Sequence, residues 1–582
     1  MASELPTPIA TGFQQRLGLF DGTMLVAGTM IGSGIFITSQ AIAVDVGSSG
    51  WLMFVWALSG IMTIIGALSY AELASMMPSA GGQYVYLKEA YSPLWGFLYG
   101  WTCFLVIQTG SIAAVAVAFA KFLGVMVPAI GTQVQLEALG PGTAKDLVAF
   151  FPALADLGTN ADYQKSIIVF AATNVNWNLS LPFASEPFFE MKHFVITAGQ
   201  IVAVSVIAFL TWLNCRGVQE GKIVQNVMGV TKTLALIGLI LVGIFVVASP
   251  MARTANYTDM WGGLAESKSV QAMQKQLPTI NLTLLGIMVV GGAMVGSLFS
   301  MDAWNNITFT AGEFKNPKRN LPLSLFFGTG MVIVLYLLAN YAFIESLPVK
   351  GNPELATQNE KLADAEYKRA AELRQANQSE AAADALAKAD RAASEAAYYR
   401  GIDGAKDDRV GTAVLELVSP RHGAYAMAIA IMISTFGCVN GMILMGARLY
   451  YVMALDNLFF RAVGKLNRRG VPAVGLIFQS IWSILLVFSG TYNELLDYVI
   501  FAVLVFYVLT VIGLFILRRT RPNAERPYRA FGYPVLPALY VVLCALVMVD
   551  LLIVKPKFTW PGLIIVLSGI PIYFCWRLLQ RK

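Results

Sequence analysis

Residues 27–36 read AGTMIGSGIF and interrupt the first long apolar stretch of the chain. Three of these ten residues are glycine, and a serine separates the last two. Glycine weakens a helix by about 1 kcal/mol relative to alanine, and the hydrocarbon of a bilayer offers no water to a loosened backbone. The run therefore indicates either a close packing contact between helices or a break in the helix that serves a ligand.

The composition is that of a membrane protein. Of its 582 residues, 57% are hydrophobic and 13% are charged, whereas a soluble domain has about 25% charged residues. Five cysteines lie in or beside apolar segments, and there are only two histidines. We therefore expect no disulfide framework, no metal site, no cofactor and no nucleic-acid partner. The first apolar stretch has no small-residue cleavage site after it, so we expect no cleaved signal peptide.

Apolar segments of roughly 20 residues predict an all-α protein that crosses the bilayer many times. Twelve such segments can be read along the sequence, at 17–44, 51–77, 92–128, 193–213, 224–249, 281–304, 322–345, 424–450, 472–489, 493–517, 534–554 and 559–576. Lysine and arginine gather in alternate connections, at 216–222, 315–319, 461–469 and 518–529, and again from 577 to the end. Positive residues favour the cytoplasmic side, so both termini are expected in the cytoplasm beneath a plasma or inner membrane.

This orientation divides the chain into seven parts. They are a cytoplasmic N-terminus (1–16), spans one to three (17–128), an external insertion (129–192), spans four to seven (193–345), an external helical insertion (346–423), spans eight to ten (424–517), and a cytoplasmic loop with spans eleven and twelve (518–582). Between Glu354 and Arg400 there is no glycine or proline, and charges of both signs alternate with alanine. This pattern predicts one or two charged helices, either merely solvated or forming a docking surface for a partner.

A second apolar segment is interrupted as well. Residues 291–306 read GGAMVGSLFSMDAWNN, so three glycines and an aspartate fall within the sixth span. Spans one and six correspond if the first ten spans form two halves of five, and paired interruptions at corresponding positions indicate a transporter binding site. The spacing of Gly28 and Gly32 alone is equally typical of close helix packing. The triplet Gly32-Ser33-Gly34, together with the charged second interruption, favours a binding site.

Six stretches of the sequence resemble one family of transporters. They are GTMIGSGIF (28–36), YAEL (70–73), PSAGGQYVY (78–86), WNN…EFKNPKRNLP (304–322), FGCVNG (436–441) and ERPYRAFGYP (525–534). Together they resemble the amino acid–polyamine–organocation (APC) superfamily and, within it, bacterial members of the L-type amino acid transporter family. The resemblance runs from about residue 17 to the C-terminus. It implies a leucine-transporter fold, with ten core helices in two inverted repeats, two further helices, and no enzymatic activity.

The resemblance also implies which residues bind an amino acid. Ser33 and Gly34 would offer N–H groups to the substrate carboxylate, and Gly32 would allow close approach. The ammonium would bind carbonyl groups of Met30 or Ile31 and of the sixth span, where the substrate-contacting residues are Phe299, Ser300 and Asp302. Phe299 would also gate the site. Asp302 departs from animal members and is expected to contact the substrate, to cap unwound backbone or to carry a proton.

Lys232 lies deep in the fifth span, within VQNVMGVTKTLAL (224–236). In the resembled family this lysine points between spans one and eight, where its ammonium takes the place of a sodium ion. The resemblance therefore implies sodium independence, with contacts to backbone near Gly28 and to the hydroxyl groups of Ser434 or Thr435. Exchange of a proton by Lys232 is the alternative.

Four further polar residues are expected to hold spans together. Asn305 is expected to tie the unwound segment to neighbouring helices. Asn440 is expected either to hydrogen-bond the first or sixth span or to make an ordinary hydrogen bond between other helices. Glu72 and Glu313 are expected either in salt bridges of an inner gate or on a solvated surface.

The function predicted is exchange or import of amino acids across a plasma membrane by alternating access. Transport of polyamines or other organocations and a membrane-embedded amino-acid sensor remain as alternatives. Catalysis is disfavoured because the spans carry no cluster of histidine, cysteine or carboxylate side chains, and a channel because no repeated polar face lines several spans. Residues 129–192 contain no cysteine, so the disulfide-linked heavy chain of animal L-type transporters is not expected here.

Overall fold

The computed structural model describes residues 13–127, 168–179, 189–406, 409–488, 492–554 and 556–580. Ten of the helices in these ranges are long and apolar enough to cross a membrane. They are α3 (Ser49–Met76), α5–α6 (Pro93–Met126), α9 (Ala198–Arg216), α10 (Val218–Leu241) with its π-helical end (Val242–Val246), α13 (Leu282–Ser300) with the 3₁₀ segment η5 (Trp304–Glu313), α14 (Pro317–Ser346), α18 (Gly423–Leu455), α20 (Tyr492–Thr520), α21 (Val535–Val554) and α22 (Pro556–Gln580).

Two further expected spans have helices at their positions. Helices α1 (Leu19–Met30) and α2 (Gly34–Val46) form one apolar segment that bends by 42° at the residues between them, and count as an eleventh candidate span. Segment 472–489 forms α19 (Ala473–Val487), which has 15 residues and is shorter than the roughly 20 that cross a bilayer untilted. The described chain is thus a helical protein with ten or eleven candidate spans, and an apolar α19 at the remaining expected position.

The start of the fourth span differs from the expectation. Strand β1 (Ile168–Leu179) pairs antiparallel with strand β2 (Phe189–Thr197), and helix α9 begins at Ala198 rather than near residue 193. The backbone N–H of Thr197 donates to the Gln200 side chain at 2.9 Å and its hydroxyl accepts from the Gln200 N–H at 3.3 Å, which is a capping box. The all-α expectation therefore describes the spans but missed this β-hairpin.

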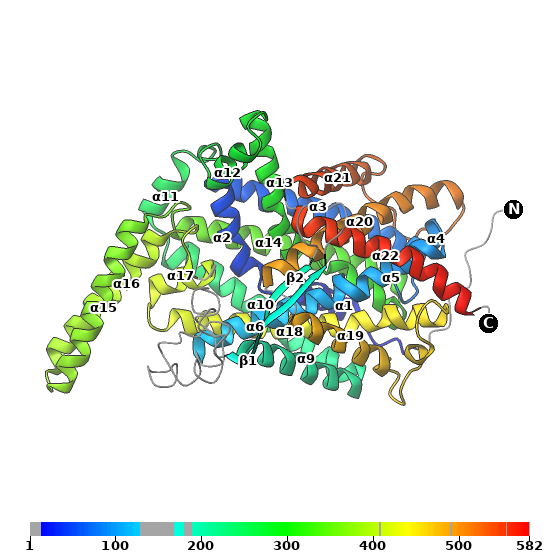
Figure 1. Cartoon of the computed structure of the whole chain (residues 1–582), viewed down its shortest axis with the longest axis horizontal. Helices are drawn as coiled ribbons and strands as arrows, with labels where there is room; N and C mark the ends of the chain where they lie inside the picture. Colours follow the sequence, from blue (N-terminus) through cyan, green and yellow to red (C-terminus); the bar gives the residue numbers. More distant parts are fainter. Residues whose placement is uncertain are drawn as a thin grey trace.

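The second insertion forms the two charged helices that its composition indicates. Helices α15 (Pro353–Gln375) and α16 (Ser379–Arg400) pack against each other and extend from one end of the molecule, while the last turn of α22 lies at the opposite end (Figure 1). Helix α17 (Val410–Val418) follows and packs on α16, α18 and α2. The remaining short helices are α4 (Gln83–Ala90), α11 (Pro250–Tyr257), α12 (Lys268–Gln276) and a 3₁₀ turn at Arg461–Gly464.

The two interrupted spans lie inside the helical bundle. Helix α1 packs against α10, α14 and α18, and helix α13 packs against α2, α3 and α21. The break in α13 does not lie at its glycines, and the break between α1 and α2 begins only after Gly28. Helix α1 continues through Gly28 to Met30, and α13 continues through Gly291, Gly292 and Gly296 to Ser300. These four glycines are helical, and the backbone leaves the helix only at 31–33 and at 301–303.

Candidate functional site

The two breaks face each other in the centre of the bundle. A Cβ atom added to Gly34, the first residue of α2, would lie 2.2 Å from Oγ of Ser300, the last residue of α13. The hydroxyl groups of Thr38 and Ser300 are 3.2 Å apart. Glycine at position 34 is therefore required for this approach. It brings the N-terminus of α2 beside the C-terminus of α13, and such termini carry N–H and carbonyl groups that have no partner within their own helix.

The carbonyl groups at the end of α1 all have donors from neighbouring helices. Lys232 Nζ donates to the carbonyl oxygens of Gly28 and of Ile31, the latter at 2.7 Å. The other three carbonyl oxygens accept from side chains of α14 and α18: Thr29 from the Cys438 thiol at 2.9 Å, Met30 from the Tyr336 hydroxyl at 2.9 Å, and Gly32 from the Ser434 hydroxyl at 3.1 Å. Met30 and Ile31, expected to accept from a substrate ammonium, are thus bonded to the protein itself.

Lys232 is buried between α1 and α18, with 2% of the residue exposed. Besides the two α1 carbonyl oxygens, its ammonium lies 3.3 Å from the backbone carbonyl oxygen of Ser434. The Ser434 hydroxyl instead donates to the carbonyl oxygens of Ile31, at 2.9 Å, and Gly32. The Thr435 hydroxyl bonds within α18, to Ile431 and Met432. The expected contacts between Lys232 and these two hydroxyl groups are therefore wrong, although the location of the ammonium matches.

The second break is built around Asp302 and Ala303. Ala303 has φ +66°, a conformation that costs a non-glycine residue free energy and is common at functional sites. The Tyr507 hydroxyl of α20 donates to Asp302 Oδ1 at 2.5 Å, and the Thr29 hydroxyl lies 3.3 Å from the Ala303 carbonyl oxygen. The Phe299 carbonyl oxygen accepts from the Asp302 N–H at 3.1 Å, and the Phe299 side chain is partly buried. Asp302 is therefore held by Tyr507 in this conformation.

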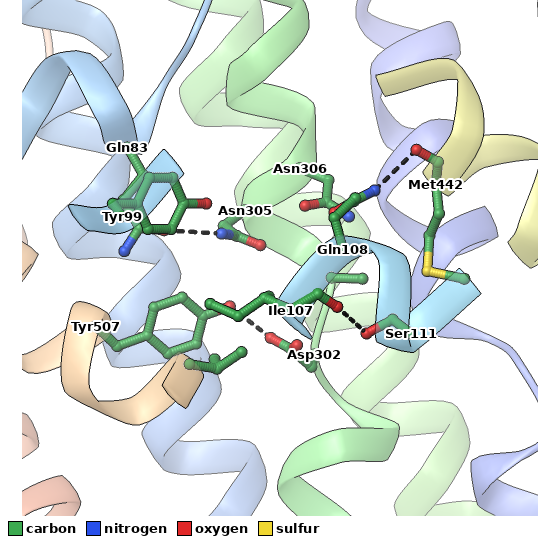
Figure 2. Close-up of a pocket in the computed structure, with 12 residues that line it drawn as sticks. Gln83, Tyr99, Ile107, Gln108, Ser111, Asp302, Asn305, Asn306, Met442 and Tyr507 are labelled. Atoms are coloured by element: carbon green, nitrogen blue, oxygen red, sulfur yellow. Dashed lines mark hydrogen bonds between the residues drawn. The ribbon is translucent and has the colours of Figure 1, made fainter. Parts of the chain in front are cut away.

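A cavity adjoins this second break, and Figure 2 shows its lining. Twelve residues from α4, α5, α6, α13–η5, α18 and α20 surround it: Gln83, Tyr99, Ile107, Gln108, Ser111, Asp302, Ala303, Asn305, Asn306, Met442, Val503 and Tyr507. Asp302 is the one carboxylate among them. Gln108 Nε2 donates to the Met442 carbonyl oxygen at 2.8 Å, which links α6 to α18. The cavity thus combines amide, hydroxyl and aromatic groups with a single carboxylate.

Both asparagines that were expected to link helices do so: Asn305 links the second break to its neighbours, and Asn440 links helices away from the two breaks. Asn305 Nδ2 donates to Gln83 Oε1 at 3.0 Å, and Gln83 donates in turn to the Thr510 hydroxyl at 3.0 Å, so the segment after the break is tied to α4 and α20. Asn440 does not reach the first or sixth span. It accepts from Asn214 at 2.9 Å and donates to Gln225 Oε1 at 3.2 Å, so it links α18 to α9 and α10.

Buried ion pairs lie at the ends of the helices that flank the N-terminal segment. Glu313 pairs with Arg448 at 2.8 Å, and their side chains are 3% and 0% exposed. Glu72 pairs with Arg518 at 2.6 Å and with Arg526 at 3.3 Å. The backbone N–H groups of Arg16 and Leu17 donate to the Glu313 carbonyl oxygen at 2.8 and 2.9 Å. Glu72 and Glu313 are therefore buried in ion pairs rather than on a solvated surface.

Sequence reasoning missed several residues that shape the site. Tyr336, Cys438 and Tyr507 donate to the two breaks, and Gln83 and Gln108 line the cavity. A glutamine or tyrosine within an apolar span is a visible signal, since polar groups there usually face protein. The partner of each could not be read from one sequence. Within the described ranges, no three His, Cys, Asp or Glu side chains come close enough together to hold a metal ion.

Two interrupted spans that meet inside the bundle, one of them beside a cavity at its break, indicate a multi-span membrane transporter, because irregular backbone at this depth is tolerated only beside a cavity or within protein. The comparisons agree. A family model described as "Amino acid permease" matches residues 17–363 and 401–574. The chain belongs to this family, which lies within the APC superfamily, and it is a transporter of amino acids rather than an enzyme.

Curated relatives are similar along almost the whole chain. The b(0,+)-type amino acid transporter 1 of Mus musculus is 25% identical over 98% of this chain and 89% of its own length. The same transporter of Homo sapiens is 24% identical, over 97% and 89%. The large neutral amino acids transporter small subunit 2 of Homo sapiens is 25% identical, over 98% and 82%. Residues 364–400, most of α15–α16, lie outside the family match.

Proposed function

We propose that this permease carries amino acids across the plasma membrane by sodium-independent secondary transport with alternating access. The observation that supports sodium independence is Lys232. A fixed ammonium, bonded to the carbonyl oxygens of Gly28, Ile31 and Ser434, supplies between α1 and α18 the positive charge that a sodium ion would otherwise bring to the same backbone oxygens. The charge is permanently attached, so no external cation is needed to hold α1 to α18.

We assign the two ends of the substrate to the two half-helices that meet at Gly34 and Ser300. The N-terminus of α2 carries the positive end of its helix dipole and N–H groups with no partner within the helix, a setting that suits the substrate carboxylate at Ser33 and Gly34. The C-terminus of α13 carries the negative end, which suits the substrate ammonium. The carbonyl oxygens of Met30 and Ile31 already accept two hydrogen bonds each. We therefore place the ammonium against residues 299–302.

The remaining parts of the proposal concern architecture. We propose a leucine-transporter fold with twelve spans, α19 included, in which the halves containing α1–α2 and α13–η5 are inverted repeats. The charge distribution supports cytoplasmic termini and external insertions at 129–192 and 346–423. One relative is named a small subunit. Since residues 129–192 contain no cysteine, we propose that this chain works without a disulfide-linked heavy chain.

The test uses purified protein in liposomes loaded with unlabelled amino acid. We expect labelled amino acid to enter at equal rates in sodium and choline buffers. The Lys232→Ala variant should lose transport at least about tenfold while eluting as a folded monodisperse protein, because removal of a buried charged group leaves its acceptors unpaired. Lys275→Ala, at an exposed position of α12, is the matched control and should transport normally. Unchanged uptake by Lys232→Ala, or a requirement for sodium, would contradict the proposal.

A further inference from the structure

Helix α21 carries a carboxylate that nothing in the site described above uses. Asp550 lies in the apolar sequence VMVDLLIV, between the buried residues Val547 and Leu551. Both of its carboxyl oxygens are buried, and within the described part of the chain neither has a hydrogen-bond partner. The neighbouring exposed side chains of α21, among them Leu546 and Val549, are apolar and suited to lipid. Asp550 is thus a titratable group inside a span with no counterion.

The helix that faces Asp550 is the interrupted sixth span. A Cβ atom added to Gly291 of α13 would lie 2.5 Å from Asp550 Oδ2 and 3.1 Å from Cγ. Any residue other than glycine at 291 would displace the carboxyl group. Gly291 therefore provides the space that the Asp550 side chain occupies, and the carboxyl group is in contact with the half-helix whose other end, at Ser300, meets the break.

Among the side chains that the structure describes, the elements that pack on α21 place no positive charge beside Asp550. Helix α13 contains no charged residue. The titratable groups of α3, α20 and α22 that the structure describes lie toward the other end of α21 or in other contacts: Tyr70, Glu72, Tyr507, Arg518, Arg519, Tyr573 and Arg577. Tyr540, which packs against Gly66 of α3, is ten residues before Asp550, or roughly 15 Å along the helix.

A cavity lies one helical turn beyond Asp550. Gly292, Ile553 and Val554 form its apolar side, and Asp45, Ser269 and Gln276 contribute polar groups from α2 and α12. The Ser269 hydroxyl donates to Asp45 at 2.6 Å. Asp550 itself does not line this cavity, but Gly292 and Val554 do, so polar groups lie within about one helical turn of the carboxyl group.

We propose that Asp550 is a proton-binding site whose occupancy is linked to the movement of α13 during transport. A buried carboxyl group without a partner is more stable neutral than charged, so Asp550 holds a proton while α13 packs on it as seen here. When α13 moves away and water enters, the carboxyl group releases the proton and becomes a hydrated carboxylate. Because the two conformations bind the proton differently, protonation favours the packed conformation and high pH favours the other. The inference rests on the proposed alternating-access function.

The test measures substrate exchange in liposomes at equal pH on both sides, from about pH 5.5 to about 8.5. We expect the wild-type rate to change at least about threefold over this range, following the protonated fraction of one group. Asp550→Asn carries a neutral side chain of the same shape and should exchange substrate at a rate that is independent of pH. Asp45→Asn, across the cavity, is the matched control and should keep the wild-type profile.

A second variant covers the case in which Asp550→Asn fails to fold. Gly291→Ala keeps the carboxyl group but crowds it, and should shift the midpoint of the pH profile. A flat wild-type profile, a wild-type profile in Asp550→Asn, or an unshifted midpoint in Gly291→Ala would each overturn the inference while leaving the transport function intact. Absence of exchange by the wild type at every pH would instead refute the proposed function.

Discussion

Lys232 and Arg448 are two buried cations whose charges are balanced in different ways. Lys232 is surrounded by backbone carbonyl oxygens, whose dipoles stabilise the ammonium without fixing it to one anion. Arg448 is paired with the carboxylate of Glu313 and also donates to the Leu444 carbonyl oxygen. The Lys232 ammonium can move away from one carbonyl oxygen and toward another without losing all of its partners. Such an arrangement suits a contact between helices that shift relative to each other. A buried ion pair such as Arg448–Glu313 has only one charged partner on each side, so it suits a contact between helices that is either fully formed or fully broken.

This difference leads to a prediction for Glu313. Replacing Glu313 by glutamine leaves the Arg448 guanidinium buried without an anion, and loss of one member of a buried pair costs about 3–5 kcal/mol. We expect the melting temperature of the purified Glu313→Gln protein to fall sharply. The double variant Glu313→Gln, Arg448→Met removes both charges and should recover most of the loss. A single variant as stable as the wild type would show that Arg448 is not effectively desolvated.

The limits of sequence reasoning at this scale come from the rotation of helices about their axes. The family resemblance placed Lys232 between spans one and eight, where the structure has its ammonium, and depth in the apolar span indicated only that it does not reach water easily. Ser434 and Thr435 could not be distinguished, since successive residues of an α-helix point about 100° apart and one sequence does not reveal which of them faces α1. For the same reason, the sequence left two alternatives for Asn440, and the structure has the hydrogen bond between other helices: its face of α18 meets α9 and α10.

At the scale of helices, the spans could be predicted and the positions of their breaks only in part. Apolar length identified the spans, because a helix has to bury its backbone polar groups across the bilayer. Glycine content located the first break to within a few residues. In α13 it misled, because Gly291 and Gly296 make room for Asp550 and Thr38 of packed neighbours, whereas the break needs the left-handed backbone of Ala303. The strand signal was present but passed over, since residues 174–179 of β1 read NVNWNL and alternate between polar and apolar side chains.

The α15–α16 hairpin illustrates a pattern that sequence shows well. Its buried alanines recur at heptad-like intervals, at 356, 363 and 370 in α15 and at 382, 385, 389, 392 and 396 in α16. Small residues at this spacing let two helices approach closely along their length. Each helix thus buries its narrow apolar stripe against the other rather than against the spans.

We predict that the hairpin can be removed without loss of transport. Its two ends are adjacent, since the Asn352 N–H donates to the Tyr399 carbonyl oxygen at 2.6 Å. Replacing residues 353–399 by two glycines should give a folded protein with an exchange rate within about twofold of the full chain, because shortening a surface loop changes its closure free energy little. A larger deletion that also removes α17, which packs on α18 and α2, should not fold. A folded but inactive short deletion would show that the hairpin takes part in transport.

The whole molecule has two ends of different character. The α15–α16 hairpin extends from one end, and the arginine-rich loop between α20 and α21 lies at the opposite end (Figure 1). Both regions are exposed, with Asp384 at 67% and Glu525 at 70% of the side chain accessible. A bilayer between these ends has to leave one of them in the cytoplasm, and the excess of positive residues favours the arginine-rich end. The orientation is therefore open to a direct test with one cysteine at each end.

We predict that a cysteine replacing Asp384 reacts with a membrane-impermeant maleimide in intact cells, whereas a cysteine replacing Glu525 reacts only after the cells are permeabilised. Cys103, Cys438 and Cys544 are buried, whereas Cys215 is half-buried and Cys575 is exposed on α22. Both variants are therefore made in a chain whose Cys215 and Cys575 are replaced by serine, which also serves as the background control. Neither exposed substitution disturbs a buried contact, since Lys388 and Lys318 pair with these carboxylates at the surface, where ion pairs contribute at most about 1 kcal/mol. Labelling of the Glu525→Cys chain alone in intact cells would invert the orientation and place the α15–α16 hairpin in the cytoplasm.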